Sequence, residues 1–280
     1  MSGRSEAEKP RSSDEKELNS PILASSRPRV LASASPSRLW EVDTLRGVAI
    51  VLMVIYHFTW DLVYFGLYQA NLLAGPWQWF ARGIATIFIF VMGVSLTLSD
   101  TRERQRLGQP PSFKKYLWRG GKILGLGLLV TAGTYFFIGR GFVIFGILHL
   151  LGLSIILAYP FLRRSRWLNL VAGLVVIAGG VYVDTLVVSY PWLIWLGIKQ
   201  AGIYMVDYYP VLPWFGLSLL GIFAGYSLYP QGVRRFALPH LADFPPVRGL
   251  RFLGRHSLLI YVIHQPILIG LLVALGFGSS

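Results

Sequence analysis

The stretch EVDTLRGVAIVLMVIYHFTWDLVYF, residues 41–65, decides the fold of this chain. It begins with two acidic residues and Arg46, then continues apolar for the roughly 20 residues that cross a bilayer. Its later polar interruptions are His57 and Asp61. An ionisable side chain inside a membrane span is energetically expensive and therefore indicates a functional site. Because residues i and i+4 share a helix face, we expect Asp61 to orient the His57 imidazole as a general base.

The composition extends this interpretation to the whole chain. Of its 280 residues, 54% are hydrophobic and 14% are charged, and the mean hydropathy is +0.55. A soluble domain is about a quarter charged, so we predict an all-α polytopic membrane bundle, which satisfies backbone groups in lipid. The net charge of +13 is better explained by cytoplasmic loops than by a nucleic-acid partner, and none is predicted. The absence of cysteine excludes disulfides and thiolate chemistry.

The chain divides into a tail and one membrane domain. Residues 1–37 are polar and lack periodicity, which predicts a disordered cytoplasmic tail ahead of a transmembrane domain at 38–280. About seven spans are predicted in that domain, at 45–66, 77–98, 118–138, 142–162, 167–188, 211–229 and 256–276.

The basic residues predict the orientation of these spans. All but Arg82, Arg140 and Lys199 of the 26 Lys and Arg fall on one side of a seven-helix chain. The positive-inside rule then places the N-terminus in the cytoplasm and the C-terminus outside, in a multi-pass protein of the plasma (inner) membrane. We interpret the aromatic segment 189–209 as an outer loop, because an extra span would move the basic loop 230–255 outward.

Two more histidines lie within predicted spans. His149 is expected about two turns from the outer end of the fourth span, and His264 about two turns from the inner end of the seventh. With His57 they could converge on one site, or each could form an interhelical hydrogen bond that only fixes packing. Their spacing does not fit a metal motif, so no metal is expected.

Polar residues also gather at the two membrane faces. Arg46, Lys122 and Arg255 stand at inner helix ends, where topology and anionic membrane lipid account for most basic residues. A ring of such cations would also suit a nucleotide-containing acyl donor. On the outer side, Arg82 and Asp207 accompany aromatic residues that include Trp214. These aromatics are typical of an interfacial belt; the alternative is that they stack on sugar rings while Arg82 and Asp207 set polar specificity.

Several segments together resemble a known family. The resemblance covers about residues 40–276, and the family is the prokaryotic heparan-alpha-glucosaminide N-acetyltransferase-like membrane proteins. The segments are DTLRG at 43–47, FVMGVSL at 90–96, FGILH at 145–149, DYYPVLPWFG at 207–216 and LGRHSLLIYVIHQP at 253–266. The spacing of Arg46 and His57 is also similar to that of a functional arginine and histidine in the acyltransferase-3 family of glycan O-acyltransferases.

The resemblance implies an enzyme that takes an acyl group from cytoplasmic acetyl-CoA or another acyl-CoA. The acceptor implied is an amino or hydroxyl group of an extracytoplasmic glycan or amino sugar. Roles carry over most directly to Arg46 and His57, then to Asp61, His149 and His264. The chain departs from the animal lysosomal members, whose active histidine follows the first helix, because residues 64–77 contain no histidine.

Two other functions stay open on the sequence. In a proton-coupled small-molecule transporter, the buried histidine and aspartate would relay protons. The lack of an internal repeat disfavours this function. In a scaffold of envelope assembly, the same histidines would only pack. A homodimer is a candidate assembly for any of the three functions.

Overall fold

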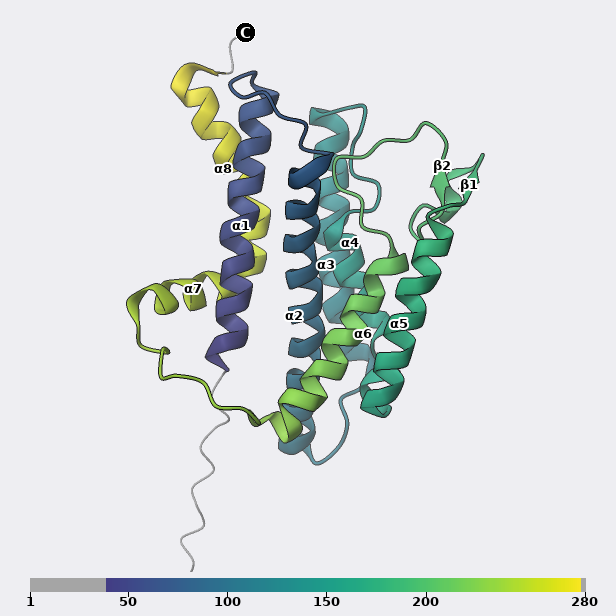
Figure 1. Ribbon diagram of the computed structural model, residues 1–280, viewed down its shortest axis with the longest axis vertical. Helices are drawn as coiled ribbons and strands as arrows, with labels where there is room; N and C mark the ends of the chain where they lie inside the picture. The colour runs from purple at the N-terminus through teal and green to yellow at the C-terminus, as the bar shows by residue number, and fades with distance from the viewer. Residues whose placement is uncertain (1–38, 278–280) are drawn as a thin grey trace, which may run out of the picture. The chain divides into compact units, whose positions relative to one another are not determined.

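The computed structural model describes residues 39–277, and almost all of its regular structure is helical (Figure 1). The predicted all-α membrane bundle is therefore confirmed. A parallel pair of two-residue strands, β1 (Val187–Val188) and β2 (Lys199–Gln200), is the exception within this part of the chain. The helices are α1 (Trp40–Tyr64), α2 (Gly75–Leu107), α3 (Phe113–Phe137), α4 (Ile147–Leu157), α5 (Arg166–Val183), α6 (Val211–Leu228), α7 (Pro245–Arg255) and α8 (Ser257–Leu272).

Six of the helices are long and apolar enough to cross a membrane, namely α1, α2, α3, α5, α6 and α8 with the turn after it. The apolar stretch Ile147–Arg163, which contains α4, is shorter. The predicted count of seven spans and the predicted orientation therefore stay predictions. The tail at 1–37 lies outside the described residues.

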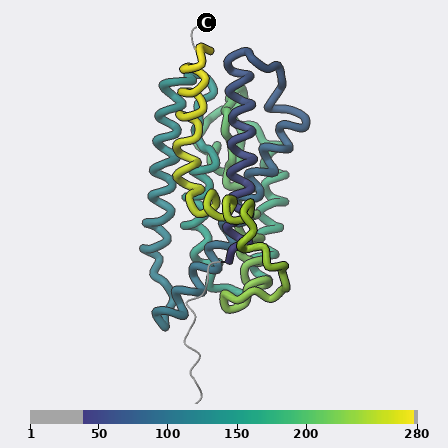
Figure 2. Tube along the Cα trace, turned by 90° about the vertical axis from the view of Figure 1, so that its left-hand side faces the viewer, coloured from purple at the N-terminus to yellow at the C-terminus, as the bar shows by residue number. Residues whose placement is uncertain are grey.

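Neighbouring helices pack in both directions. α5 with α6, α3 with α4, and α1 with α2 run antiparallel, whereas α2 with α6 and α1 with α8 run parallel (Figures 1 and 2). α1 also makes an extensive contact with α7. We call the end where α1 begins and α2 ends the basic end. The opposite end, where α1 ends and α2 begins, is the aromatic end.

α1 and α7 cross at the basic end with their backbones in contact. A Cβ atom on Gly254 of α7 would lie 1.8 Å from the carbonyl oxygen of Asp43, and one on Gly47 of α1 would lie 1.9 Å from that of Leu250. No side chain fits at either position, so both glycines are needed for this crossing. The crossing fixes the start of α8, which follows α7 directly.

Two predicted boundaries were wrong. The fourth span was expected from residue 142, but α4 begins at Ile147, because the backbone of Gly146 is extended (φ −95°, ψ −171°) and caps the helix there. The segment 230–255 was predicted as a loop, yet its second half forms α7. That helix is amphipathic and rich in arginine, so a search for apolar segments misses it.

Candidate functional site

Two cavities lie at opposite ends of α1. The aromatic-end cavity has a volume of about 780 Å³, and its wall includes His57. The basic-end cavity has a volume of about 380 Å³, and its wall includes Arg46. Since α1 is uninterrupted between these two residues, they lie about 16 Å apart along its axis.

The aromatic-end cavity brings together four of the residues singled out in the sequence. Its wall receives His57 from α1, Arg82 from α2, Asp207 from the segment before α6, and Trp214 from α6. These residues are far apart in the chain, and their convergence makes this cavity the main candidate site.

Aromatic rings form much of this wall. The Tyr209 and Trp214 rings meet edge to face with their centroids 4.8 Å apart. The hydroxyl of Tyr56 donates to the carbonyl oxygen of Leu72 at 3.2 Å, which holds the ring beside the loop after α1. Flat rings flanked by polar groups are suited to a ligand with both apolar faces and hydroxyl or amino substituents.

Asp207 contributes a carboxylate to the same cavity. Its Oδ2 accepts a hydrogen bond from the backbone N–H of Ile147 at 3.0 Å, at the first residue of α4. Desolvation in the cavity raises the pKa of Asp207 to about 6, and the hydrogen bond from Ile147 partly opposes that rise. The side chain therefore links the start of α4 to the cavity and offers it an acidic group.

His57 has a different partner from the one expected. Its Nδ1 donates to the Met53 carbonyl oxygen at 3.0 Å, and its ring lies 4.7 Å from that of His264, centroid to centroid. Asp61, the expected partner, instead accepts a hydrogen bond from the amide of Gln265. The reason is that α8 packs on the face of α1 that carries both residues, and an i,i+4 pattern within α1 cannot reveal this.

His149 does not join the other two histidines. It is the third residue of α4, not two turns into a span, and its Nδ1 accepts from the N–H of Gly146 at 3.2 Å. Its Nε2 lies 3.3 Å from the hydroxyl of Thr131, and the ring packs over Gly127 of α3. These contacts close the start of α4 and join it to α3.

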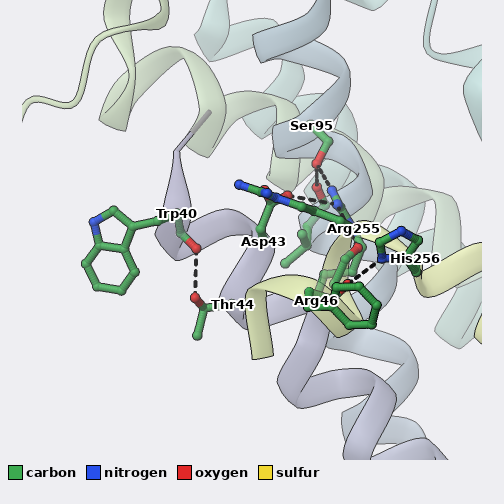
Figure 3. A network of polar contacts seen from close by, with 10 residues as sticks. Trp40, Asp43, Thr44, Arg46, Ser95, Arg255 and His256 are labelled. Atoms are coloured by element: carbon green, nitrogen blue, oxygen red, sulfur yellow. Dashed lines mark hydrogen bonds and ion pairs between the residues drawn. The ribbon is translucent and has the colours of Figure 1, made fainter. Parts of the chain in front are cut away.

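The basic-end cavity is built around Arg46 (Figure 3). The Arg46 guanidinium donates to the hydroxyl of Ser95 at 2.6 Å and to the carboxylate of Asp43 at 3.3 Å. It also donates to the carbonyl oxygen of Gly254 at 3.3 Å, so α1, α2 and α7 meet at one side chain. Arg102 and Arg106, from the last two turns of α2, add two more cations to a wall that also contains the carboxylates of Asp43 and Glu103.

The expected ring of three cations is only partly assembled. Arg255 stands behind Arg46, with its Nε 3.4 Å from the other Asp43 oxygen. Lys122 lies on α3 over the Trp118 ring, 4.9 Å from its centroid, and is not part of the cavity wall in the described chain. Arg102 and Arg106 were counted among the basic residues of the inner surface but not in the expected ring, which was placed at helix ends; their i,i+4 spacing could have added them to it.

Apolar side chains lie between Arg46 and His57 along α1, and two residues of this cluster, Met53 and Ile84, also line the aromatic-end cavity. Ile50 and Met53 of α1 pack with Ile84 of α2, and the side chains of Ile50 and Met53 are 1% and 3% exposed. A ligand reaching from Arg46 to His57 must pass this cluster.

Comparison with known proteins gives one family. The model for the family described as heparan-alpha-glucosaminide N-acetyltransferase, catalytic, matches residues 38–266. The human heparan-alpha-glucosaminide N-acetyltransferase is 32% identical over 115 residues, which are 37% of this chain and 15% of the human protein. The mouse heparan-alpha-glucosaminide N-acetyltransferase is 32% identical over 127 residues, 41% of this chain and 17% of the mouse protein. The matched part thus spans less than a fifth of either relative. No solved structure matches.

Proposed function

The chain belongs to the heparan-alpha-glucosaminide N-acetyltransferase catalytic family, and on that premise we propose that it is an acyl-CoA-dependent membrane acyltransferase. It moves an acetyl or other short acyl group from cytoplasmic acyl-CoA to an amino or hydroxyl group of an extracytoplasmic sugar. One observation carries the proposal: a single helix, α1, presents Arg46 to a cationic cavity and His57 to an aromatic cavity at the other end.

The donor binds at the basic end. Arg46, Arg102 and Arg106 hold the phosphates of the nucleotide part, because planar guanidinium groups pair with phosphate oxygens through two hydrogen bonds. The pantetheine arm passes between helices past the apolar cluster around Ile50 and delivers the thioester toward His57. The abundance of basic residues at this end supports a cytoplasmic location for it.

The acceptor binds at the aromatic end. Tyr209 and Trp214 stack against the faces of a sugar ring, and Asp207 and Arg82 bind its polar substituents. Asp207 pairs with a cationic amine, which makes an amino sugar the acceptor that this cavity suits best.

His57 is the general base. Its Nδ1–H is held by the Met53 carbonyl oxygen, so the Nε2 lone pair is free to take a proton from the acceptor. The acceptor nitrogen or oxygen then attacks the thioester carbonyl; the new C–N or C–O bond forms, and the C–S bond breaks. His57 returns the proton to the thiolate, which leaves as coenzyme A. An acyl group carried briefly on His57 is the covalent variant of this route.

The test uses the purified chain in lipid nanodiscs with labelled acetyl-CoA and glucosamine. We expect acetyl-CoA to bind, and glucosamine to become acetylated. Arg46→Gln should lose binding, whereas His57→Gln should keep binding and lose transfer. Protein that binds no acetyl-CoA, or that carries glucosamine into vesicles without any donor, would contradict the proposal.

A further inference from the structure

Four polar side chains face one another between α1 and α8. They are His57 and Asp61 of α1, and His264 and Gln265 of α8, and we call them the polar quartet. Asp61 is 2% exposed and His264 is 8% exposed, so the quartet is largely withdrawn from solvent. Polar groups are costly at such depth, and the one hydrogen bond between the two helices in this quartet, from Gln265 to Asp61, uses neither histidine ring.

Both histidines are held in the same tautomer. Nδ1 of His264 lies 2.8 Å from the Tyr261 carbonyl oxygen and 3.2 Å from that of Ile260, while Nδ1 of His57 lies 3.0 Å from that of Met53. A carbonyl oxygen can only accept, so each Nδ1 carries the hydrogen. In the neutral rings both Nε2 atoms are therefore proton acceptors.

The quartet also holds unused acceptors. Within the described chain, Nε2 of His264, Oδ2 of Asp61 and Oε1 of Gln265 are buried without a hydrogen-bond partner. An unsatisfied buried polar atom costs about 1–3 kcal/mol, and these three belong to residues on two facing helices, α1 and α8. All three atoms are hydrogen-bond acceptors, so an additional proton in the cluster would give them a donor.

The proposed reaction has a proton to dispose of. A neutral amine loses one proton when it is acylated, and the departing thiolate takes that proton up. An amine that arrives as an ammonium ion brings a second proton, for which neither product has a place. That proton must leave before the nitrogen lone pair can attack.

We propose that His264 and Asp61 form a proton relay behind His57 that removes the surplus proton of an ammonium acceptor. His57 Nε2 takes the proton from the ammonium nitrogen and passes it to the neutral His264. Because no hydrogen bond or ion pair joins His264 to Asp61 in the described chain, a water molecule between their unpartnered atoms carries the proton on to the Asp61 carboxylate, one helical turn before the end of α1, and the proton leaves at the aromatic end. His57 is neutral again and takes the second proton as the C–N bond forms, then gives it to the thiolate.

This relay rests on the proposed acyltransferase function and adds two residues that do not touch the substrate. Of the quartet, His57 also lines the aromatic-end cavity, whose wall holds the other titratable or charged groups on this side. They are Tyr56, Arg82, Asp184, Lys199, Asp207, Tyr208, Tyr209 and Tyr261.

The test measures glucosamine acetylation against pH in His264→Gln and Asp61→Asn. Below the pKa of the acceptor amine, we expect kcat to fall about 100-fold in either variant, which is the usual size of an acid–base contribution. Above that pKa the amine arrives neutral, and the loss should shrink to a few-fold. Acetyl-CoA binding should be unchanged, which also reports that the variants are folded. His240→Gln, an exposed histidine in the loop before α7, is the matched control.

Each other outcome overturns the relay. Equal losses at every pH in both variants would mean that the quartet only supports packing. If His57→Gln is inactive while both relay variants keep full activity, the relay fails and the acyltransferase proposal stands. If the wild-type chain transfers no acetyl group, both proposals fail together.

Discussion

The two cavities differ in what they can hold. The basic-end cavity is smaller, about 380 Å³, and three arginines stand in its wall. The aromatic-end cavity is about twice that volume, at 780 Å³, and tyrosine and tryptophan rings form much of its wall. Fixed cations select for phosphate, whereas rings with scattered polar groups select for sugars. The contrast indicates two ligands that enter from opposite ends of the bundle.

The cavities also differ in how they are supported. Arg46 is held by hydrogen bonds to Ser95 and Gly254, so its position is fixed before a ligand arrives. His57 has one backbone hydrogen bond and a neighbouring imidazole. Under the proposed function, the first cavity binds the donor and the second exchanges protons. Four predictions separate these roles.

The largest effect is expected for His57→Gln. Loss of the general base should lower kcat by about 10²–10⁴-fold and leave the Kd for acetyl-CoA unchanged, because the base does not contact the donor phosphates. Single-turnover transfer and calorimetric binding measure the two quantities. A parallel loss of donor binding would show that the cavities do not work separately.

The second effect concerns the crossing of α1 and α7. Gly254→Ala would place a Cβ atom 1.8 Å from the Asp43 carbonyl oxygen, and we expect a loss of about 3 kcal/mol in unfolding free energy. Donor binding should fall with it, because Arg46 bonds to the carbonyl oxygen of Gly254.

The matched control for this variant is Gly249→Ala on the same helix, where an added Cβ atom meets nothing within 4 Å. It should leave stability unchanged or raise it slightly through helix propensity. Thermal unfolding in detergent compares the two. Equal stability in both variants would contradict a backbone-to-backbone crossing.

The third effect is on donor affinity. Arg46→Gln should weaken acetyl-CoA binding about 10–100-fold, the range expected when a hydrogen bond to a charged group is lost. Arg46→Lys keeps the charge without the planar fork and should recover part of the loss. Arg235→Gln, an exposed arginine at the same end, should change binding little. If it weakens binding as strongly as Arg46→Gln, general charge and not the cavity is responsible.

The smallest effect is a pH dependence at the aromatic end. The folded-state pKa of Asp207, about 6, lies above the ordinary value of 3.8, so the folded protein holds this proton more tightly. Its stabilising contribution is complete below about pH 4 and is lost as the pH rises through about 6. Asp207→Asn should remove about 1–2 kcal/mol of this pH-dependent change in the free energy of unfolding.

The control is Asp184→Asn, whose side chain is 63% exposed and paired with Lys199. Its unfolding curve should follow that of the wild type across the same pH range. If the free energy of unfolding of Asp207→Asn still falls between about pH 4 and 6 as in the wild type, the pH dependence belongs to another group.

The sequence predicted the helical bundle because long apolar segments carry that information locally. It also singled out Arg46 and His57, since charges near or within an apolar span stand out. It did not predict the pairing of His57 with His264 or of Asp61 with Gln265, because both pairs depend on the packing of α8 against α1. Whether any of these residues acts in catalysis stays a prediction.

Two kinds of helix were harder to predict. α7 was missed because its stabilisation comes from a glycine crossing with α1, a contact between residues about 200 positions apart. The start of α4 was misplaced because the extended backbone at Gly146 and the hydrogen bond from Ile147 to Asp207 mark it, and hydropathy reports neither.

The α1–α7 crossing has a consequence for how the protein is made. Along the chain, α1 is synthesised well before α7 and α8. Gly254 of α7 then brings its carbonyl oxygen to Arg46, and α8 brings Tyr261 to the wall of the aromatic-end cavity and His264 to His57. The aromatic-end cavity therefore stays incomplete until α8 packs, whereas the wall of the basic-end cavity comes from α1, α2 and the residue before α1, and only the hydrogen bond from Arg46 to Gly254 waits for α7.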